Sequence, residues 1–187
     1  MRVVAGAWRG RTLKSPTWEG LRPTSDRLRE TIFNVLAHAY DDPVAGARVL
    51  DLFAGTGAMG LEALSRGGAF ALFVDDSAAA RGLIRQNIEA LGLGGETRLF
   101  RRDATRMGKA APNAPFSLVF CDPPYGKDLA PKALASCAEG GWLAPGALVV
   151  VEEAKGVEVA LPEGFTELER RDYGETRVVF GRYEGQG

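Results

Sequence analysis

The chain has 187 residues, of which 45% are hydrophobic and 25% are charged, and its formal net charge is −1. A chain of this length can form one domain, with or without a small extension, around a substantial hydrophobic core. No apolar run approaches the roughly 18 residues that a membrane span requires, and the N-terminus lacks the apolar segment of a signal peptide. Two cysteines and one histidine offer neither a disulfide framework nor a zinc cluster. We therefore expect a cytoplasmic protein without a metal.

The first part of the chain is basic. Residues 1–29 carry seven basic side chains and only two acidic ones, although arginine richness could also reflect compositional bias or thermal adaptation. A short hairpin is predicted here, followed by a helix whose candidate caps are Thr24, Ser25 and Asp26 and whose apolar residues recur at helical spacing from Leu28. Residues 41–47 are a plausible linker. This pattern divides the chain into a basic extension, residues 1–40, and a domain of residues 41–187.

Strands and helices alternate beyond the linker. The predicted strands are Arg48–Leu52, Phe70–Val74, Thr97–Phe100, Phe116–Cys121 and Ala147–Val151, and the predicted helices are Ala58–Arg66, Ser77–Leu91 and Leu129–Ala138. Strands of nearly continuous Val and Leu that alternate with helices indicate an α/β fold with a parallel sheet covered on both faces. Thr166–Asp172 and Thr176–Tyr183 surround a Tyr-Gly turn, which predicts a hairpin and an antiparallel strand at one sheet edge.

A glycine-rich turn follows the first of these strands. Gly55, Gly57 and Gly60 match G-x-G-x-x-G between a strand and a helix, and Asp75 ends the second strand 18 residues after Gly57. This context is typical of a loop that binds a nucleotide, with Asp75 placed to accept hydrogen bonds from ribose hydroxyls. Taken alone, the pattern also fits a dehydrogenase, or a turn that serves only tight strand–helix packing.

Asp51 distinguishes between the possible cofactors. A pyrophosphate at a helix N-terminus binds to backbone N–H groups and is repelled by a carboxylate a few residues upstream. A ligand with an ammonium and a sulfonium group would instead be attracted by such a carboxylate. D-x-x-x-G-x-G, from Asp51 through Ala54 and Gly55 to Gly57, is the first motif of S-adenosylmethionine-dependent methyltransferases. Asp103 and Ala104 follow the third strand, where the Asp103 carboxylate could accept a hydrogen bond from the adenine amino group of that cofactor. Asp76 is an alternative to Asp75 as the ribose ligand.

The stretch F-C-D-P-P-Y-G ends the fourth predicted strand abruptly, because proline cannot donate to a sheet ladder. In a doubly wound sheet this strand neighbours the first one, so Asp122 should emerge beside the glycine turn. The Asp122 carboxylate and the Pro123 carbonyl are two acceptors that could orient an exocyclic amine of a nucleobase, freeing its lone pair for methylation. Tyr125 offers a flat face on which an extruded base can stack. The structural alternative is a Pro-Pro turn that merely closes a strand.

The basic extension is a candidate RNA surface. Arg9, Arg11, Lys14, Arg22 and Arg27 are the predicted backbone contacts, each adding salt-dependent affinity. Trp8 and Trp18 interleave with them as possible stacking faces, although we slightly favour core packing for both. Arg27 and Arg29 lie one turn into the helix and could instead face the cofactor pocket.

The chain resembles the RsmD-type small-subunit ribosomal RNA guanine-N2 methyltransferases over nearly its whole length. The resemblance is carried by G-x-x-R-G-R-x-L (Gly6 to Leu13), R-P-T-S-D-R-x-R-E-x-x-F-N (Arg22 to Asn34), D-L-F-A-G-T-G (Asp51 to Gly57), D-P-P-Y (Asp122 to Tyr125) and Y-G-x-T (Tyr173 to Thr176). Many N-methyltransferases share D-P-P-Y, whereas the N-terminal block is much more specific. One departure is V-D-D-S, where the family usually has Glu, a variable residue, then Asp or Asn.

The resemblance implies a Rossmann-like class I methyltransferase fold with a seven-stranded, mostly parallel sheet and an antiparallel edge strand. It implies methylation of N2 of one guanine in 16S rRNA, within the 30S subunit or an assembly intermediate, with S-adenosylmethionine as the donor. We expect a monomer with no membrane partner. Two alternatives stay open: another RNA or DNA base-amine methyltransferase, and a catalytically silent RNA-binding assembly module with the same fold.

Overall fold

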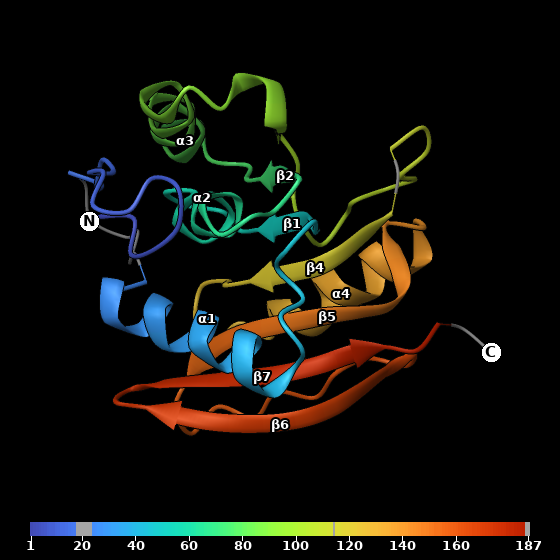
Figure 1. The fold of residues 1–187 in the computed structure, drawn as a ribbon. Helices are drawn as coiled ribbons and strands as arrows, with labels where there is room; N and C mark the ends of the chain where they lie inside the picture. Colours follow the sequence, from blue (N-terminus) through green and yellow to red (C-terminus); the bar gives the residue numbers. More distant parts are fainter. Residues whose placement is uncertain (18–23, 114, 186–187) are drawn as a thin grey trace.

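The computed structural model describes residues 1–17, 24–113 and 115–185 (Figure 1). The helices are α1 (Asp26–Ala39), α2 (Ala58–Ser65), α3 (Ala78–Leu91), the short 3-10 helix η1 (Gly94–Glu96) and α4 (Leu129–Glu139). The strands are β1 (Arg48–Leu52), β2 (Phe70–Val74), β3 (Thr97–Phe100), β4 (Phe116–Cys121), β5 (Leu143–Ala154), β6 (Phe165–Tyr173) and β7 (Thr176–Tyr183). None of the helices in these described ranges is long and apolar enough to cross a membrane.

Local sequence signals account for where the helices begin and end. The Ser25 hydroxyl caps α1 by accepting a hydrogen bond from the backbone N–H of Leu28, and the Ser77 hydroxyl caps α3 in the same way. Gly92 ends α3 in the left-handed conformation, with φ of 69°, a conformation that glycine adopts without steric cost. The helix boundaries therefore lie within a residue or two of those predicted from the sequence.

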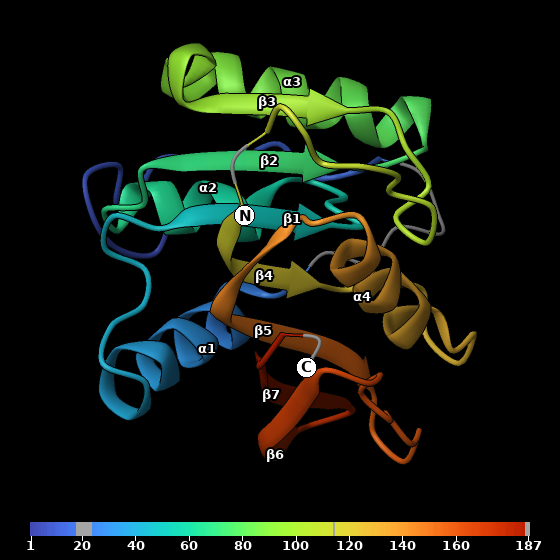
Figure 2. The ribbon, with the colours of Figure 1, turned by 90° about the vertical axis from the view of Figure 1, so that its right-hand side faces the viewer.

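One seven-stranded sheet runs through the molecule in the order β3-β2-β1-β4-β5-β7-β6. The first five of these strands are parallel, and β7 pairs antiparallel with both β5 and β6. Figure 2 shows the strands stacked in this order from β3 to the β6–β7 hairpin. The predicted mostly parallel sheet with an antiparallel edge is confirmed.

The fifth strand is longer than predicted. The sequence predicts Ala147–Val151, but β5 starts at Leu143, before Pro145 and Gly146, and extends to Ala154. The pairing of β4 with β5 shifts register between Phe116 and Leu118, and this irregularity accommodates the two strand-breaking residues. At its other end, the extra length carries Glu152 and Glu153 to the edge of the sheet where β1 and β4 also end.

Helices cover the two faces of the sheet unequally. Helices α1, α2 and α3 lie on one face and α4 lies on the other (Figures 1 and 2). The first face is packed around Phe33 of α1, Phe73 of β2 and Phe120 of β4, and the second around Trp142 and Phe116. Burial of nearly every residue of β1, β2 and β4 between these two layers explains their almost uninterrupted apolar sequences.

The predicted N-terminal hairpin is reduced to one antiparallel bridge between Arg2 and Thr12, flanked by a few backbone hydrogen bonds. Its apolar residues Val3 and Leu13 are buried in the same cluster as α1, α2 and α3. Gly6, with φ of 85°, lies so close to α2 that an added Cβ would stand 1.9 Å from the Ser65 carbonyl oxygen. The N-terminal segment is therefore fitted closely onto the end of α2.

Candidate active site

The carboxyl ends of β1 and β4 bring the two predicted motifs together. Leu52 of β1 is paired with Cys121 of β4, and the backbone N–H of Asp122 donates to the Leu52 carbonyl over 3.5 Å. The D-P-P-Y loop therefore begins beside the glycine-rich turn, as the doubly wound order predicts. Ligands of open α/β sheets bind at this kind of edge, where the strand order reverses.

Asp51 lies at the base of the glycine-rich turn and is only 3% exposed. One carboxylate oxygen accepts a hydrogen bond of 3.0 Å from the backbone N–H of Gly60 in α2. Burial raises the pKa of Asp51 well above its ordinary value, the Gly60 bond lowers it, and the nearby carboxylates of Asp122 and Asp75 raise it again. A cation placed here would relieve this accumulation of negative charge.

The turn itself is held open by left-handed glycines and by Asp75. Gly55 and Gly57 have φ of 60° and 79°, and Ala54 is buried beneath them. One carboxylate oxygen of Asp75 accepts from the Gly55 N–H at 3.0 Å, and the other accepts from the Ser77 N–H at 2.9 Å. Asp76 is exposed beside it. Asp75 therefore shapes the glycine-rich turn and links it to the start of α3.

Asp103 and Ala104 follow β3, at the same end of the sheet. Asp103 is exposed, and one of its oxygens accepts hydrogen bonds from both the backbone N–H and the hydroxyl of Thr105. These bonds lower the pKa of Asp103, so the group is an anion at neutral pH. Ala104 is buried next to it. A charged acceptor followed in the chain by a small buried residue suits an amino group on the rim of a flat aromatic ring.

Thr24 contacts both the D-P-P-Y loop and β5, and we did not predict these contacts from the sequence. Its hydroxyl lies 3.4 Å from a carboxylate oxygen of Asp122 and 3.2 and 3.3 Å from the two oxygens of Glu152. Glu152 is buried at the end of β5. Thr24 is 98 positions from Asp122 and 128 positions from Glu152 along the chain. Two features of the sequence could have drawn attention to these residues. Glu152 is one of two consecutive glutamates at the end of an apolar strand, and Thr24 lies within the R-P-T-S-D-R block.

The rest of the D-P-P-Y loop is anchored to the C-terminal strands. The hydroxyl of Tyr125 is 3.1 Å from that of Thr176 at the start of β7, and the backbone N–H of Gly126 donates to Glu153 at 3.0 Å. Pro123 is buried, whereas Tyr125 is half-buried. Contacts from two strands therefore support a loop that its prolines already make stiff.

The predicted RNA contacts of the extension are exposed where the structure describes them. Arg9, Arg11 and Lys14 all present exposed side chains. One guanidinium nitrogen of Arg11 donates to the Ala90 carbonyl near the end of α3 at 2.6 Å, so this arginine also secures the segment to the domain. Trp8 packs partly buried against the core, which is the alternative we favoured for it. Arg22 and Trp18 lie outside the described residues.

The two arginines of α1 have different environments. Arg27 is exposed and lines a cavity between α1 and the β6–β7 turn. Arg29 is fully buried and its guanidinium contacts Glu62 at 3.1 Å and Asp26 at 2.9 Å. The suggestion that Arg29 faces the cofactor pocket is therefore wrong. The helical pattern showed that Arg29 lies in the first turn of α1, but it did not show that Arg29 pairs with Glu62 of α2.

This arrangement defines the class of the protein. Acidic side chains lie at or just beyond the carboxyl ends of three adjacent parallel strands. The proline-containing D-P-P-Y loop follows β4, and the antiparallel β7 lies beside β5. Among the described residues, no cluster of three His, Cys, Asp or Glu side chains is arranged to hold a metal ion. The fold is that of the class I methyltransferases, whose Rossmann-like sheet carries ligands at this edge.

One known protein family matches nearly the whole chain. The family described as "Conserved hypothetical protein 95" matches residues 1–182, and the chain belongs to this family. A relative from Escherichia coli K12, called ribosomal RNA small subunit methyltransferase D, is 42% identical over 163 residues, which cover 87% of this chain and 78% of that protein. A protein of the same name from Haemophilus influenzae is 36% identical over 93% of this chain and 89% of its own length.

Solved structures agree with this family. The Escherichia coli protein yhhF superposes with a TM-score of 0.82 at 34% identity, covering 100% of this chain and 99% of its own. A protein from Haemophilus influenzae, described as a putative methylase, superposes with a TM-score of 0.77 at 31% identity, covering 97% of each chain. The RsmD-type resemblance predicted from the sequence motifs is confirmed.

Proposed function

We propose that this protein transfers a methyl group from S-adenosylmethionine to the exocyclic N2 of one guanine in 16S rRNA, within the 30S subunit or an assembly intermediate. The observation that carries the proposal is the position of Asp122, which opens the D-P-P-Y loop directly beside the turn that begins at Asp51. A donor site and an acceptor for an amine thus meet at one edge of the sheet. The names of the relatives support ribosomal RNA as the substrate class.

The residues at and beyond the carboxyl ends of β1, β2 and β3 fit S-adenosylmethionine. The buried Asp51 carboxylate suits the ammonium and sulfonium charges, Asp75 suits the ribose hydroxyls, and the anionic Asp103 suits the adenine amino group. Ala54, Gly55 and Gly57 leave room for close approach to the turn, and Ala104 supplies an apolar surface. The cofactor supplies an electrophilic methyl group, and every other requirement of the reaction falls on the protein.

Replacing Asp51 with asparagine should weaken cofactor binding while it stabilises the ligand-free protein. Folding raises the pKa of Asp51. The protonated Asp51 therefore adds to the free energy of unfolding at a pH below the ordinary carboxyl pKa, and this contribution is lost as the pH rises through the raised pKa of the folded protein. Burial therefore makes the ionised form of Asp51 costly in the ligand-free protein. Asp51→Asn should weaken S-adenosylmethionine binding roughly tenfold or more, since it removes a charge-assisted contact, and should raise the Tm of the ligand-free protein by a few degrees.

Calorimetric titration of the cofactor and thermal unfolding at pH 7 measure the two effects. Asp76→Asn is a suitable control for stability, because Asp76 is exposed. Unchanged cofactor affinity in Asp51→Asn would remove Asp51 from the binding site.

The chemistry at N2 is a problem of orientation. The lone pair of a guanine amine is delocalised into the ring, which makes the nitrogen a poor nucleophile. The Asp122 carboxylate and the Pro123 carbonyl accept hydrogen bonds from its two hydrogens, favour a pyramidal nitrogen and direct the lone pair toward the methyl group. The prolines, the Thr24 hydroxyl and the Gly126–Glu153 bond hold these acceptors in place before the base arrives. Tyr125, tied at its hydroxyl to Thr176, offers the stacking surface.

Residues 1–40 are, in this proposal, the RNA-facing extension of a methyltransferase domain formed by residues 41–187. Arg9, Arg11, Lys14, Arg22 and Arg27 contact the RNA backbone, and their exposure, where described, leaves them accessible to it.

Neutralising Arg9 and Arg11 together, as Arg9→Gln with Arg11→Gln, should weaken RNA binding. Each lost phosphate contact lowers the slope of log affinity against log salt by about 0.7 to 0.9, so the slope of the double variant should fall by roughly one to two. Filter binding of unmodified 16S rRNA at several salt concentrations measures this. Arg98→Gln, on the exposed edge strand β3, is the matched control. Equal affinity and an equal slope in the double variant would place the RNA on another surface.

The proposed function is tested by incubating the protein with labelled S-adenosylmethionine and either naked 16S rRNA or 30S particles that lack the modification, then mapping the labelled nucleotide. Label on guanine N2 supports the proposal. Label on an adenine amine, or on DNA or tRNA offered in parallel, would favour a different base-amine methyltransferase. RNA binding without any transfer would favour the silent assembly module.

A further inference from the structure

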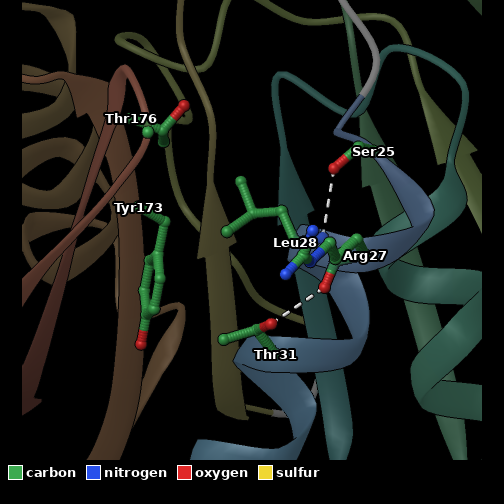
Figure 3. Close-up of a pocket in the computed structure, with 7 residues that line it drawn as sticks. Ser25, Arg27, Leu28, Thr31, Tyr173 and Thr176 are labelled. Atoms are coloured by element: carbon green, nitrogen blue, oxygen red, sulfur yellow. Dashed lines mark hydrogen bonds between the residues drawn. The ribbon is translucent and has the colours of Figure 1, made fainter.

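A cavity of about 460 Å³ lies between the first turns of α1 and the β6–β7 turn. Figure 3 shows its two walls: Arg27, Leu28 and Thr31 come from α1, and Tyr173 and Thr176 come from the opposite hairpin. A volume of this size falls within the range of pockets that bind small organic molecules. The reaction described above makes no use of the space between these walls.

The walls combine an aromatic ring, an aliphatic side chain and a cation. Tyr173 and Leu28 are half-buried and pack against the core from opposite sides of the opening. Arg27 is exposed at the cavity and is the charged residue among its described lining. A flat ring facing an aliphatic group suits a nucleobase, and a guanidinium at the same opening suits a phosphate.

The cavity adjoins the catalytic loop but is distinct from it. Thr176 of its wall contacts the Tyr125 hydroxyl at 3.1 Å, and Ser25 of its rim follows Thr24, which contacts Asp122. None of the D-P-P-Y residues is among the described residues that line the cavity. A base whose amine reaches Asp122 therefore lies beside the cavity, and the chamber can hold a neighbour of that base.

Resting on the proposed function, we propose that this cavity binds an unstacked nucleotide that flanks the methylated guanine. The flanking base stacks on Tyr173 with Leu28 on its other face, and Arg27 contacts its phosphate. Binding the neighbour in this chamber pulls the guanine out of its stack and presents it at Asp122. The cavity thereby contributes to the choice of the nucleotide to be methylated, which the D-P-P-Y loop alone does not make.

The test couples protein variants to altered RNA. Full-length wild type, Tyr173→Leu, Tyr173→Phe, Arg27→Gln and the control Arg98→Gln are compared by RNA affinity, by KM and kcat, and by S-adenosylmethionine affinity. Tyr173→Leu should weaken RNA binding about tenfold, the size expected for one stacked base, while Tyr173→Phe stays within about twofold because it keeps the ring. Arg27→Gln should lower the salt slope by about one. Cofactor affinity should not change in any variant.

A series of 16S rRNA fragments, each with one abasic ribose, then locates the stacked base. At one position, the abasic fragment should bind the wild-type protein about tenfold more weakly than the intact fragment does. The Tyr173→Leu variant should bind the same abasic fragment and the intact fragment equally well, because this variant has already lost the stacking contact. The proposal expects that position beside the methylated guanine. It is overturned if no position shows this coupling, or if the coupled position is the methylated guanine itself. Failure of wild type to methylate guanine would refute the proposed function instead, and the affinity coupling would still decide whether the cavity binds a base.

Discussion

Asp122→Ala is expected to reduce the rate of methyl transfer by about 10²- to 10³-fold or more, which is the size of effect seen when one positioned group that stabilises a transition state is removed. In the proposed mechanism, the variant loses the carboxylate that orients the amine but keeps Pro123 and the stacking residue Tyr125. S-adenosylmethionine should still bind, because the cofactor contacts that we propose for Asp51, Asp75 and Asp103 remain in the variant. Single-turnover transfer to 16S rRNA, together with calorimetric titration of the cofactor, measures both quantities.

Asp122→Asn is the informative partner of this variant. Asparagine keeps one acceptor oxygen in the same place, so it should retain part of the activity that alanine loses. Thr24→Val removes the hydroxyl that contacts Asp122 and Glu152 and should lower kcat without changing cofactor affinity. Full activity in Asp122→Ala would show that the lone-pair mechanism is wrong.

Glu62→Ala is expected to lower the free energy of unfolding by about 3–5 kcal/mol, because it leaves the fully buried guanidinium of Arg29 without its main counter-charge. The Glu62 carboxylate accepts four bonds: from the backbone N–H groups of Val4 and Ala5 at 2.8 and 3.1 Å, from Arg29 at 3.1 Å and from Arg66 at 2.9 Å. Its loss should therefore also release the N-terminal segment from α2 and weaken RNA binding.

Urea unfolding, with RNA affinity measured below the transition, tests this expectation. Glu30→Ala, at an exposed glutamate of α1, should change stability by no more than about 0.5 kcal/mol. The double variant Arg29→Met with Glu62→Leu should be less destabilised than the sum of the two single variants, because it leaves no uncompensated charge. A midpoint equal to that of wild type in Glu62→Ala would show that the pair does not hold the extension.

The sequence by itself was sufficient to locate β1 to β4, the motifs and the adjacency of those motifs, although not the full length of β5. Apolar runs indicated β1 and β4 directly, and the prolines after Asp122 marked the end of β4 because they cannot donate to the sheet. Alternation of strands and helices restricts the topology to a few solutions, and in the doubly wound one Asp51 and Asp122 must lie on neighbouring strands.

Contacts between distant segments required the tertiary structure. Periodicity tells which face of α1 is apolar, but it does not tell that Arg29 on that helix is buried against Glu62, 33 residues away. The single glutamate in the otherwise small and apolar α2 was the available signal. Likewise, Thr24 reaches Asp122 and Glu152 only because α1 begins at the edge where β4 and β5 end.

The cavity between α1 and the β6–β7 turn has the same origin. Its walls belong to two motifs that are far apart in the sequence, and the space exists because a helix from the start of the chain packs near a hairpin from its end. Local sequence determines which residues carry acceptors, rings and charges, because backbone preferences and apolar periodicity are local. Which of those groups meet is decided by packing, since only the folded sheet brings together residues separated by about a hundred positions or more.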